Sequence, residues 1–531
     1  MSVPYPQLSA VALFVLIAIF AMLRLRLLDL PLERDEGEYA YAGQLLLHGF
    51  PPYRLLYNMK WPGTYAAYAA IMGVFGETIT GIRIGLVLVT SATAICVYLL
   101  TRRLFGRTAG VVAAATQLLL SITLAAMGPY GHATHFVALA AVAGMLFLLP
   151  ARGEKVPLRL RSGQAAADEG PRWPQLALSG ALFALAALMK QPGMMFGFFA
   201  VAWLLTSKRI RDAAILIGGA LLVGALTLAS LSIAGVFARF KLWTIDYARQ
   251  YVSQITLEQG LETFGRNFGA IFSYTSLLWW IALAGLVLLF VDAESRKQWR
   301  FVIGFLIAGF AATVPGLYFR PHYFIVLFPA VAMLTGIAVK ATSRLRSWRA
   351  LPAIAYAVAF LITLGQQWPT LVGMSTMAIT RMRYGENPFP EAIDVAAYIK
   401  EHTGPEDRVA VLGSEPEIYF YSGRKSATGY IYTYPLMEKQ KFAHHMQEEM
   451  IAEIESAKPK YIVTVSVPMS WLSRPDSDRT IFEWSEKYVT ANYVLDGIAD
   501  ITPGTTQYVW GPDALRYTPK THDVLMVFRR K

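Results

Sequence analysis

The chain has 531 residues, of which 55% are hydrophobic and only 16% are charged, and its formal net charge is +12. Soluble globular proteins average about 45–50% apolar and about 25% charged residues, so this composition excludes most soluble classes and indicates a protein solvated by a membrane. The single cysteine, Cys96, lies in an apolar run, which excludes a disulfide framework and a cysteine zinc site.

The basic excess belongs to the hydrophobic part of the chain. Residues 1–365 hold 30 basic and 15 acidic side chains, a net charge of +15, whereas residues 366–531 hold 18 and 21, a net charge of −3. We therefore predict two domains, a transmembrane domain over 1–366 and a soluble domain over 367–531.

Eleven apolar runs approach the roughly 20 residues that a helix needs to cross a bilayer core of about 30 Å. They are residues 9–28, 81–100, 108–127, 132–149, 175–190, 192–206, 213–235, 271–291, 301–317, 323–340 and 351–366. The fifth and sixth runs are short. The sequence therefore predicts an all-α polytopic membrane bundle of about eleven spans.

The loops between these runs alternate in charge. Five alternate loops hold eighteen Lys and Arg residues, whereas the intervening short loops hold only Lys190 and Arg320. Because cytoplasmic loops carry the excess of Lys and Arg, we predict a multi-pass protein of the plasma (bacterial inner) membrane with a cytoplasmic N-terminus. The loops 29–80 and 236–270 and the domain 367–531 then lie outside.

Two segments differ from the rest of the predicted membrane domain. Arg24 and Arg26 lie at the outer end of the first run and go against the charge rule. The predicted inner loop at 150–174 has no apolar periodicity, and we expect no chemistry there.

The extracytoplasmic domain alternates between two kinds of pattern. Residues 393–403 and 446–457 have the spacing of amphipathic helices, and residues 408–413 and 460–467 read as buried strands. Such an alternation is typical of a small α/β domain.

The first outer loop concentrates acidic side chains directly after the first span. Glu33, Asp35, Glu36 and Glu38 fall within six residues. A carboxylate placed there can act as a general base toward a hydroxyl or an amine. The alternative is a helix start, in which Asp35 is the N-cap and Glu38 completes a capping box.

Three basic residues stand in loops where topology does not require them. Lys60, flanked by Met59 and Trp61, suits either a fixed cation that binds a phosphate or an interfacial anchor. Phosphate binding explains Arg320 better than topology does, and Lys190 has the same standing with weaker support.

His132 and His135 open the fourth run three residues apart, as expected for one helix face. They could support a metal pair or line a polar cavity. A divalent metal is therefore conceivable but has no further support, and we assign no cofactor. The sequence has no glycine-rich nucleotide loop, so an activated donor would come from the membrane.

The second outer loop, 236–270, is rich in aromatic residues, namely Phe240, Trp243, Tyr247 and Tyr251. It suits an interfacial amphipathic element that covers the site, or equally a simple aromatic belt.

Four segments together resemble the polyprenyl-phosphate-dependent glycosyltransferases of family 39, which have the GT-C fold and include protein O-mannosyltransferases and lipid A aminoarabinose transferases. They are Asp35-Glu36, Tyr57-Asn58-Met59-Lys60-Trp61-Pro62, Lys190-Gln191-Pro192-Gly193 and Arg320-Pro321-His322-Tyr323. The resemblance covers roughly residues 8–340. Met59 and Trp61 interrupt the family's simpler Lys-Pro-Pro segment, and the acidic residue that opens the fourth span in many relatives is missing here.

The resemblance implies a role for each of these segments. Asp35 would be the catalytic base with Glu36 beside it, and Lys60 and Arg320 would bind the lipid phosphate. Substrate binding would extend to four further residues, Tyr57, Lys190, His322 and His135.

The sequence thus favours an enzyme that transfers a hexosyl or pentosyl group from a polyprenyl phosphate to a glycan, lipid or protein acceptor at the outer face, with inversion. Its partners would be membrane lipids and these substrates, not nucleic acid. One alternative is a transporter or flippase of a lipid-linked sugar, which the position of Arg83, Lys190 and Arg320 near the outer ends of the spans disfavours. The other is a non-catalytic envelope assembly protein.

Overall fold

The computed structural model describes residues 5–149, 173–344 and 350–531. The chain divides into two compact units. The membrane unit takes in residues up to 27, 83–230 and 255–373, and the sheet unit takes in 28–82, 231–254 and 374–531. Nearly all of the predicted inner loop at 150–174, together with Arg346 and Arg349, lies outside the described residues.

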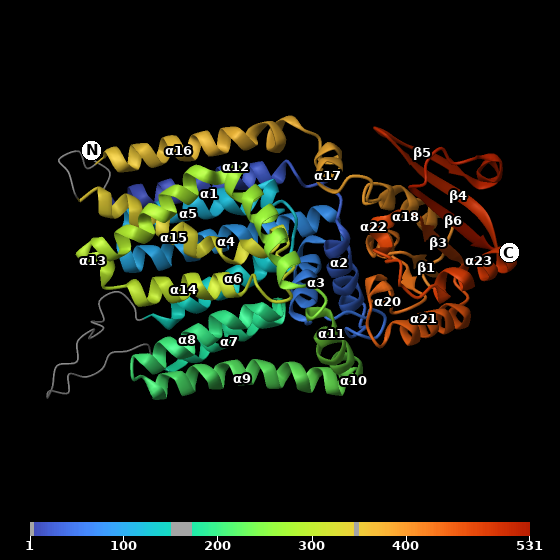
Figure 1. Cartoon of the computed structure of the whole chain (residues 1–531), viewed down its shortest axis with the longest axis horizontal. Coiled ribbons are helices and arrows are strands. Elements are labelled where there is room, and N and C mark those ends of the chain that lie inside the picture. Colours follow the sequence, from blue (N-terminus) through green and yellow to red (C-terminus); the bar gives the residue numbers. More distant parts are fainter. Residues whose placement is uncertain (1–4, 150–172, 345–349) are drawn as a thin grey trace. The chain divides into compact units, whose positions relative to one another are not determined.

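The membrane unit is built of long helices that lie side by side and run along a common direction (Figure 1). They are α1 (Tyr5–Leu25), α4 (Ile79–Phe105), α5 (Arg107–Ile122), α6 (Ala133–Leu148), α7 (Trp173–Met189), α8 (Met194–Thr206), α9 (Ile210–Ile233), α12 (Leu257–Val291), α13 (Ala293–Arg296), α14 (Trp299–Ala311), α15 (Phe328–Thr342) and α16 (Leu351–Trp368). Each of the eleven predicted runs falls wholly or mainly on one of these helices.

Length separates these helices into two groups. Six described segments are long and apolar enough to cross a membrane by themselves: Leu8–Leu25, Ile79–Phe105, Ile210–Ile233, Leu257–Val291, Pro321–Thr342 and Leu351–Gly373. Helices α5, α6, α7, α8 and α14 are apolar but shorter. The predicted count of eleven spans is therefore not confirmed.

Small residues let the helices of the membrane unit approach closely. A side-chain carbon added at Gly285 of α12 would lie 1.9 Å from the carbonyl oxygen of Leu334 on α15, and one at Gly180 of α7 would lie 1.8 Å from that of Leu216 on α9. In lipid there is little hydrophobic drive between helices, so such close packing supplies much of the attraction.

Predicted inner loop ends gather at one end of the membrane unit. Arg103, near the end of α4, donates to the carbonyl oxygens of Leu146 and Leu149 at the end of α6, at 2.6 and 2.9 Å. The ammonium of Lys340, near the end of α15, lies 5.2 Å from the centroid of the Phe105 ring. These contacts agree with the predicted alternation, while the identity of the cytoplasmic end stays a prediction.

Arg24, one of the two exceptions to the charge rule, is a packing residue. Its side chain is buried and donates to the carbonyl oxygen of Ser121 at 2.6 Å and to that of Gly128 at 3.1 Å. These carbonyls lie at the end of α5 and just beyond it, where helical hydrogen bonding stops. Arg24 therefore supplies hydrogen bonds to backbone carbonyls at the end of α5 and just beyond it, which explains its position.

The sheet unit contains one six-stranded sheet with the order β2-β1-β3-β6-β4-β5. The strands are β1 (Arg408–Leu412), β2 (Lys425–Ser426), β3 (Tyr461–Val465), β4 (Tyr493–Thr502), β5 (Thr505–Trp510) and β6 (Val524–Arg530). Strand β1 pairs in parallel with β2 and β3, and the remaining pairs are antiparallel. The sequence predicted β1 and β3 but missed β2, β4, β5 and β6.

Eleven helices complete the sheet unit. They are α2 (Arg34–Leu47), α3 (Gly63–Phe75), α10 (Phe237–Lys241), α11 (Ala248–Val252), α17 (Thr376–Tyr384), α18 (Glu391–Glu401), α19 (Glu417–Ser422), α20 (Tyr434–Met437), α21 (Ala443–Ala457), α22 (Pro468–Trp471) and α23 (Thr480–Asn492). The predicted helices at 393–403 and 446–457 correspond to α18 and α21. Helix α18 buries Ala392, Val395, Ala396 and Ile399, the three-and-four spacing of an amphipathic helix.

The second predicted outer loop is shorter and more buried than we expected. Residues 257–270 are helical and belong to α12, which is irregular only at Thr275. Trp243 and Tyr247 are buried in one cluster with Tyr57 and Tyr430. The belt and interface interpretations are therefore wrong for these two aromatic side chains, which are core residues of the sheet unit.

We predict that Gly285→Val destabilises the membrane unit, because the new side chain collides with the backbone of α15. The expected loss is at least about 1–3 kcal/mol, visible as a lower unfolding temperature of the detergent-solubilised protein. Gly224→Val on α9 is the matched control, since nothing lies within 4 Å of a carbon added there. An equal loss in both variants would contradict close packing at Gly285.

Candidate active site

The N-cap of helix α2 lies two residues before Asp35, the N-cap that the sequence suggested. Its N-cap is Glu33, whose side chain accepts from the amide of Glu36 at 3.0 Å, while the Glu36 carboxylate accepts from the Glu33 amide at 3.4 Å. The prediction of Asp35 and Glu38 as the box is therefore wrong. Glu36 is buried in this cap, which satisfies amides that a helix start leaves open.

Lys60 joins two acidic residues of α2. Its ammonium lies 2.7 Å from a carboxylate oxygen of Asp35 and 2.7 Å from one of Glu38. Since the helix begins at Arg34, the two acids stand three residues apart on one face, and both reach the same cation. The Lys60 ammonium also lies 4.5 Å from the ring centroid of Tyr39 and 5.5 Å from that of Tyr432.

The two carboxylates differ in their surroundings. The Glu38 side chain is fully buried and accepts further hydrogen bonds from Asn58 at 2.8 Å and Tyr65 at 2.6 Å. The Asp35 side chain is 14% exposed. Asp35 is thus the acid that a solvent molecule or a substrate can reach, and Glu38 is held inside.

The charge of Lys60 is maintained by its neighbours. Burial lowers the pKa of the Lys60 ammonium, but the carboxylates of Asp35 and Glu38 outweigh this effect and raise that pKa well above its usual value. Burial raises the pKa of the Glu38 carboxyl, and the Lys60 ammonium opposes the rise. At neutral pH the site therefore contains a fixed positive charge next to Asp35.

Arg34 attaches the start of α2 to the C-terminal part of the sheet unit. Its guanidinium donates to the carbonyl oxygen of Ser414 at 2.6 Å and the hydroxyl of Tyr434 at 2.7 Å, and it pairs with Glu415 at 3.0 Å. Glu415 is fully buried. Because Arg34 directly precedes Asp35, this network fixes where the Asp35 backbone lies.

Tyr57, a predicted substrate-binding residue, is packed into the sheet unit. Its hydroxyl donates to Glu453 at 2.8 Å, its ring stacks on Trp243 with centroids 6.0 Å apart, and its amide donates to the Gly429 carbonyl at 2.7 Å. Only 5% of Tyr57 is exposed. The structure thus shows it anchoring the loop that carries Lys60.

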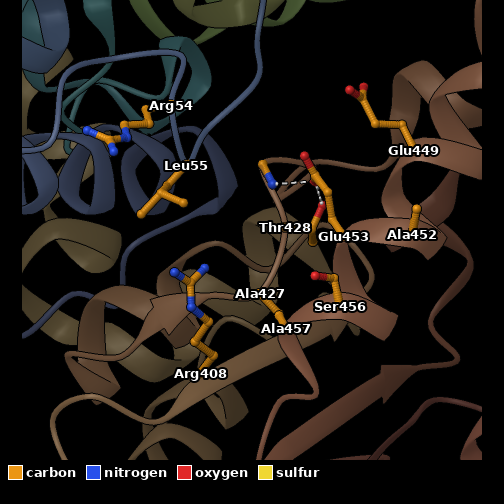
Figure 2. A pocket seen from close by; sticks show the side chains of 11 residues that line it. Arg54, Leu55, Arg408, Ala427, Thr428, Glu449, Ala452, Glu453, Ser456 and Ala457 are labelled. Carbon is orange, nitrogen blue, oxygen red and sulfur yellow. Dashed lines mark hydrogen bonds between the residues drawn. The ribbon is translucent and has the colours of Figure 1, made fainter.

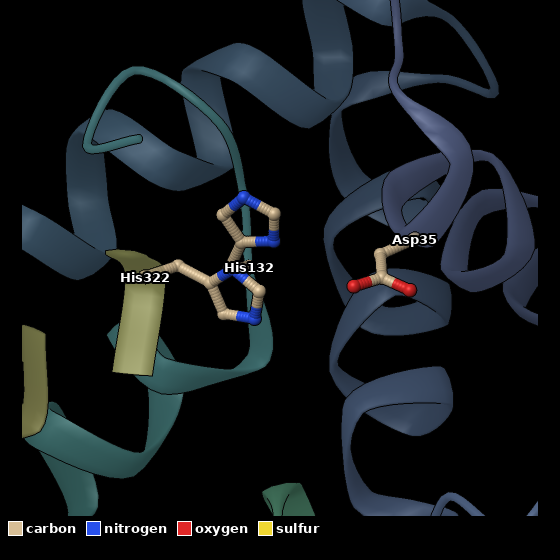
Figure 3. A group of neighbouring side chains, drawn as sticks. All are labelled: Asp35, His132 and His322. Carbon is tan, nitrogen blue, oxygen red and sulfur yellow. The ribbon is translucent and has the colours of Figure 1, made fainter. Parts of the chain in front are cut away.

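The membrane unit gathers predicted residues from three separate hairpins. The rings of His132, before α6, and His322, before α15, stack with centroids 3.9 Å apart and planes 11° apart (Figure 3). The Tyr323 ring meets His322 edge-on, and the ammonium of Lys190, between α7 and α8, lies 3.3 Å from the Tyr323 centroid. The hairpins predicted to share one face thus do so.

The other predicted residues of the membrane unit take different positions. Arg320 lies 5.6 Å from the ring centroid of Tyr318, and the carbonyl of the intervening Phe319 accepts from Asn267 at 3.0 Å. His135 is buried on α6, and its Nε2 has no hydrogen-bond partner among the described residues. We expected His132 and His135 to lie together on one helix face. The ring that stacks on His132 is instead that of His322.

The sequence and the fold were compared with known proteins. A sequence profile described as dolichyl-phosphate-mannose-protein mannosyltransferase matches residues 60–158. No curated protein matches the chain. Among solved structures, ArnT from Cupriavidus metallidurans bound to undecaprenyl phosphate is similar, with a TM-score of 0.60 and 14% identity over 97% of each chain. This chain has the GT-C fold.

Two further structures share the GT-C fold. ArnT from Cupriavidus metallidurans in the apo state has a TM-score of 0.57 and 13% identity, with 97% of each chain covered. The arabinofuranosyltransferase AftD from Mycobacteria has a TM-score of 0.52 and 14% identity over 99% of this chain and 40% of its own. The GT-C fold expected from the sequence is confirmed, and the chain is a multi-pass membrane protein.

Several residues of the candidate site were not predicted from the sequence. Asn58, named only as part of the segment around Lys60, and Tyr65 had no predicted role. A polar residue two positions before Lys60 and a tyrosine at the start of an apolar helix could have indicated partners for a buried acid. Arg34 and Glu415 are separated by 381 residues, and no local pattern connects them.

We predict that Lys60→Met strongly destabilises the sheet unit, because the buried carboxylate of Glu38 would lose its positively charged partner. Losing one partner of a buried pair costs about 3–5 kcal/mol. Because the pKa of Lys60 is raised, the lysine's contribution to stability is fully present below the ordinary lysine pKa of about 10 and is lost as the pH rises through the raised pKa. The pair is also lost in acid, where the Glu38 carboxyl, whose pKa burial raises, takes up a proton. Thermal unfolding near pH 7 tests this.

The matched control is the double variant Lys60→Met/Glu38→Gln, which removes both charges. It should recover part of the lost stability, because a neutral amide needs no counter-charge. Additive losses in the double-mutant cycle would show that the two side chains do not depend on each other.

Proposed function

We propose that this protein is a glycosyltransferase that moves a sugar from a polyprenyl-phosphate donor to an acceptor at the outer face of the plasma membrane. The observation that carries the proposal is the partly exposed carboxylate of Asp35 beside the fixed charge of Lys60 on a GT-C fold. The match to a dolichyl-phosphate-mannose mannosyltransferase profile and the undecaprenyl phosphate bound to ArnT support the class of donor.

Asp35 is the proposed base. It removes the proton from an acceptor hydroxyl or amine as the electron pair of that group attacks the anomeric carbon of the sugar. The bond from the anomeric carbon to the phosphate oxygen breaks, and its electrons leave on polyprenyl phosphate. In-line attack inverts the anomeric configuration. Glu38 is too deeply buried to reach the acceptor and serves to hold Lys60.

Lys60 has a double role in this scheme. An ammonium has three N–H donors, and two of those of Lys60 point at Asp35 and Glu38. Since its side chain is 21% exposed, the third donor can meet the leaving phosphate. The leaving group gains negative charge as the bond breaks, so a fixed cation lowers the barrier.

The membrane unit supplies the other proposed contacts. Arg320 and Lys190 are the cations of its predicted outer hairpins. Lys190 lies over the Tyr323 ring, which meets His322 edge-on, and His322 stacks on His132. We propose that Arg320 and Lys190 bind the donor phosphate and that the histidine rings line the space for the sugar. His135 is buried in the first turn of α6, and we propose that it lines the same space.

We predict that Asp35→Asn lowers sugar transfer by about 10²–10⁴-fold, the usual contribution of a general base. The amide keeps the size of the side chain, so thermal unfolding should change far less than activity. Asp29→Asn, which removes an exposed carboxylate just before α2, is the control and should retain transfer. Transfer is measured as polyprenyl phosphate released from a labelled lipid-linked sugar in the presence of membrane extract; retained activity in Asp35→Asn would remove Asp35 from the reaction.

We predict that Lys60→Arg keeps part of the activity and that Lys60→Ala loses most of it, with a raised KM for the lipid-linked donor. Arginine retains the charge that the leaving phosphate needs but not the compact geometry. Steady-state kinetics with donor varied at fixed acceptor check this. An unchanged KM in Lys60→Ala would restrict Lys60 to a structural role.

A further inference from the structure

A pocket of about 530 Å³ lies in the sheet unit, and its volume suits a small ligand. One wall is a face of α21, from Glu449 to Ala457. The other walls are the start of β1, the segment Ala427–Gly429 after β2, and the segment Arg54–Leu55 before α3. Figure 2 shows the guanidinium groups of Arg54 and Arg408 toward one end and the carboxylates of Glu449 and Glu453 toward the other.

The two carboxylates are already engaged by the protein. Glu453 accepts from Tyr57 at 2.8 Å, from Thr428 at 2.6 Å and from the amide of Gly429 at 3.0 Å. Glu449 pairs with Arg239 at 2.7 Å and accepts from the Tyr430 hydroxyl. These bonds hold the pocket wall in place, and both carboxylates still border the cavity.

The two arginines are differently placed. Arg408 donates to the carbonyl of Ser426 at 3.3 Å, and within the described residues neither Arg54 nor Arg408 forms an ion pair with a carboxylate. Two guanidinium groups without an ion-paired carboxylate among the described residues therefore border one cavity. A guanidinium recognises carboxylate and phosphate through parallel N–H donors, so this end of the pocket suits an anion.

We propose that this pocket binds an acidic saccharide, one that carries a carboxylate or a phosphate. The anionic group would meet Arg54 and Arg408, and sugar hydroxyls would donate to the carboxylates of Glu449 and Glu453, which line the same pocket. The hydroxyl of Ser456 adds a further polar group on the same wall. A neutral sugar would satisfy only the carboxylate end.

The pocket is connected to the candidate active site through a short segment. Arg54 and Leu55 line the pocket, the neighbouring Tyr53 donates to the carbonyl of Lys60 at 2.7 Å, and Asn58 donates to Glu38. A ligand held by Arg54 therefore contacts the segment 53–60, which positions Lys60. If the proposed transferase function holds, on which this step rests, the acidic saccharide is the acceptor or a part of it.

The test measures binding without any donor. The purified full chain in detergent is titrated by calorimetry with the disaccharide of glucuronic acid and glucose, with glucose 6-phosphate, with cellobiose and with inorganic phosphate. We expect an acidic saccharide to bind at least about tenfold more tightly than cellobiose, and Arg54→Gln and Arg408→Gln each to weaken that binding about tenfold or more. Arg516→Gln, which removes an exposed charge elsewhere in the sheet unit, should leave it unchanged.

Each alternative result overturns the inference. Equal binding of cellobiose would show that charge is not recognised, and binding of inorganic phosphate as tight as that of the sugars would show that no saccharide is recognised. Unchanged affinity in a folded Arg54→Gln protein would place the ligand elsewhere. The titration contains no donor and measures binding alone, so a failed transferase assignment leaves this measurement intact.

Discussion

The arrangement of the site depends on one partly buried cation held between two carboxylates. An ammonium taken out of water is costly unless opposite charges surround it, and Lys60 meets this condition with Asp35 and Glu38, each at 2.7 Å. The two acids come from a helix and the cation from the following loop. The ion pairs therefore fix the geometry of this loop against α2, and a substrate that binds here meets charges already in place.

A second buried charge extends the same principle to the C-terminal part of the sheet unit. Arg34 connects α2 to Ser414, Tyr434 and Glu415, so the residue before Asp35 has no freedom of its own. Glu36, on the other side of Asp35, is used in the helix cap. With both neighbours immobilised, Asp35 is the partly exposed acid of this turn, and its environment sets it apart from three chemically similar neighbours.

The sequence predicted what depends on single residues and their near neighbours. Hydropathy located the helices of the membrane unit because the preference of an apolar side chain for lipid is a local property. It misplaced the helix start, since Glu33 with Glu36 and Asp35 with Glu38 have the same three-residue spacing. Only the tertiary pairing of Lys60 with both Asp35 and Glu38 favours the earlier start.

Contacts between distant segments could not be predicted in this way. His132 and His322 stack although 190 residues separate them, and Arg34 pairs with Glu415 across 381 residues. The family resemblance implied that Lys190 and His322 bind substrate, and in the structure both contact the Tyr323 ring. Such pairings follow from the packing of whole helices. No local pattern in a single sequence reveals them.

Charge balance explains why the proposed reaction needs cations from more than one segment. Lys60 with ionised Asp35 and Glu38 carries a net charge of −1, so this cluster alone repels a phosphate. A polyprenyl phosphate leaving group becomes more negative as its bond to the sugar breaks. Lys60 can therefore direct one N–H at the phosphate but cannot neutralise it, and the remaining positive charge must come from elsewhere. Arg320 and Lys190, which topology leaves unexplained, are the residues of the predicted outer hairpins that can supply it.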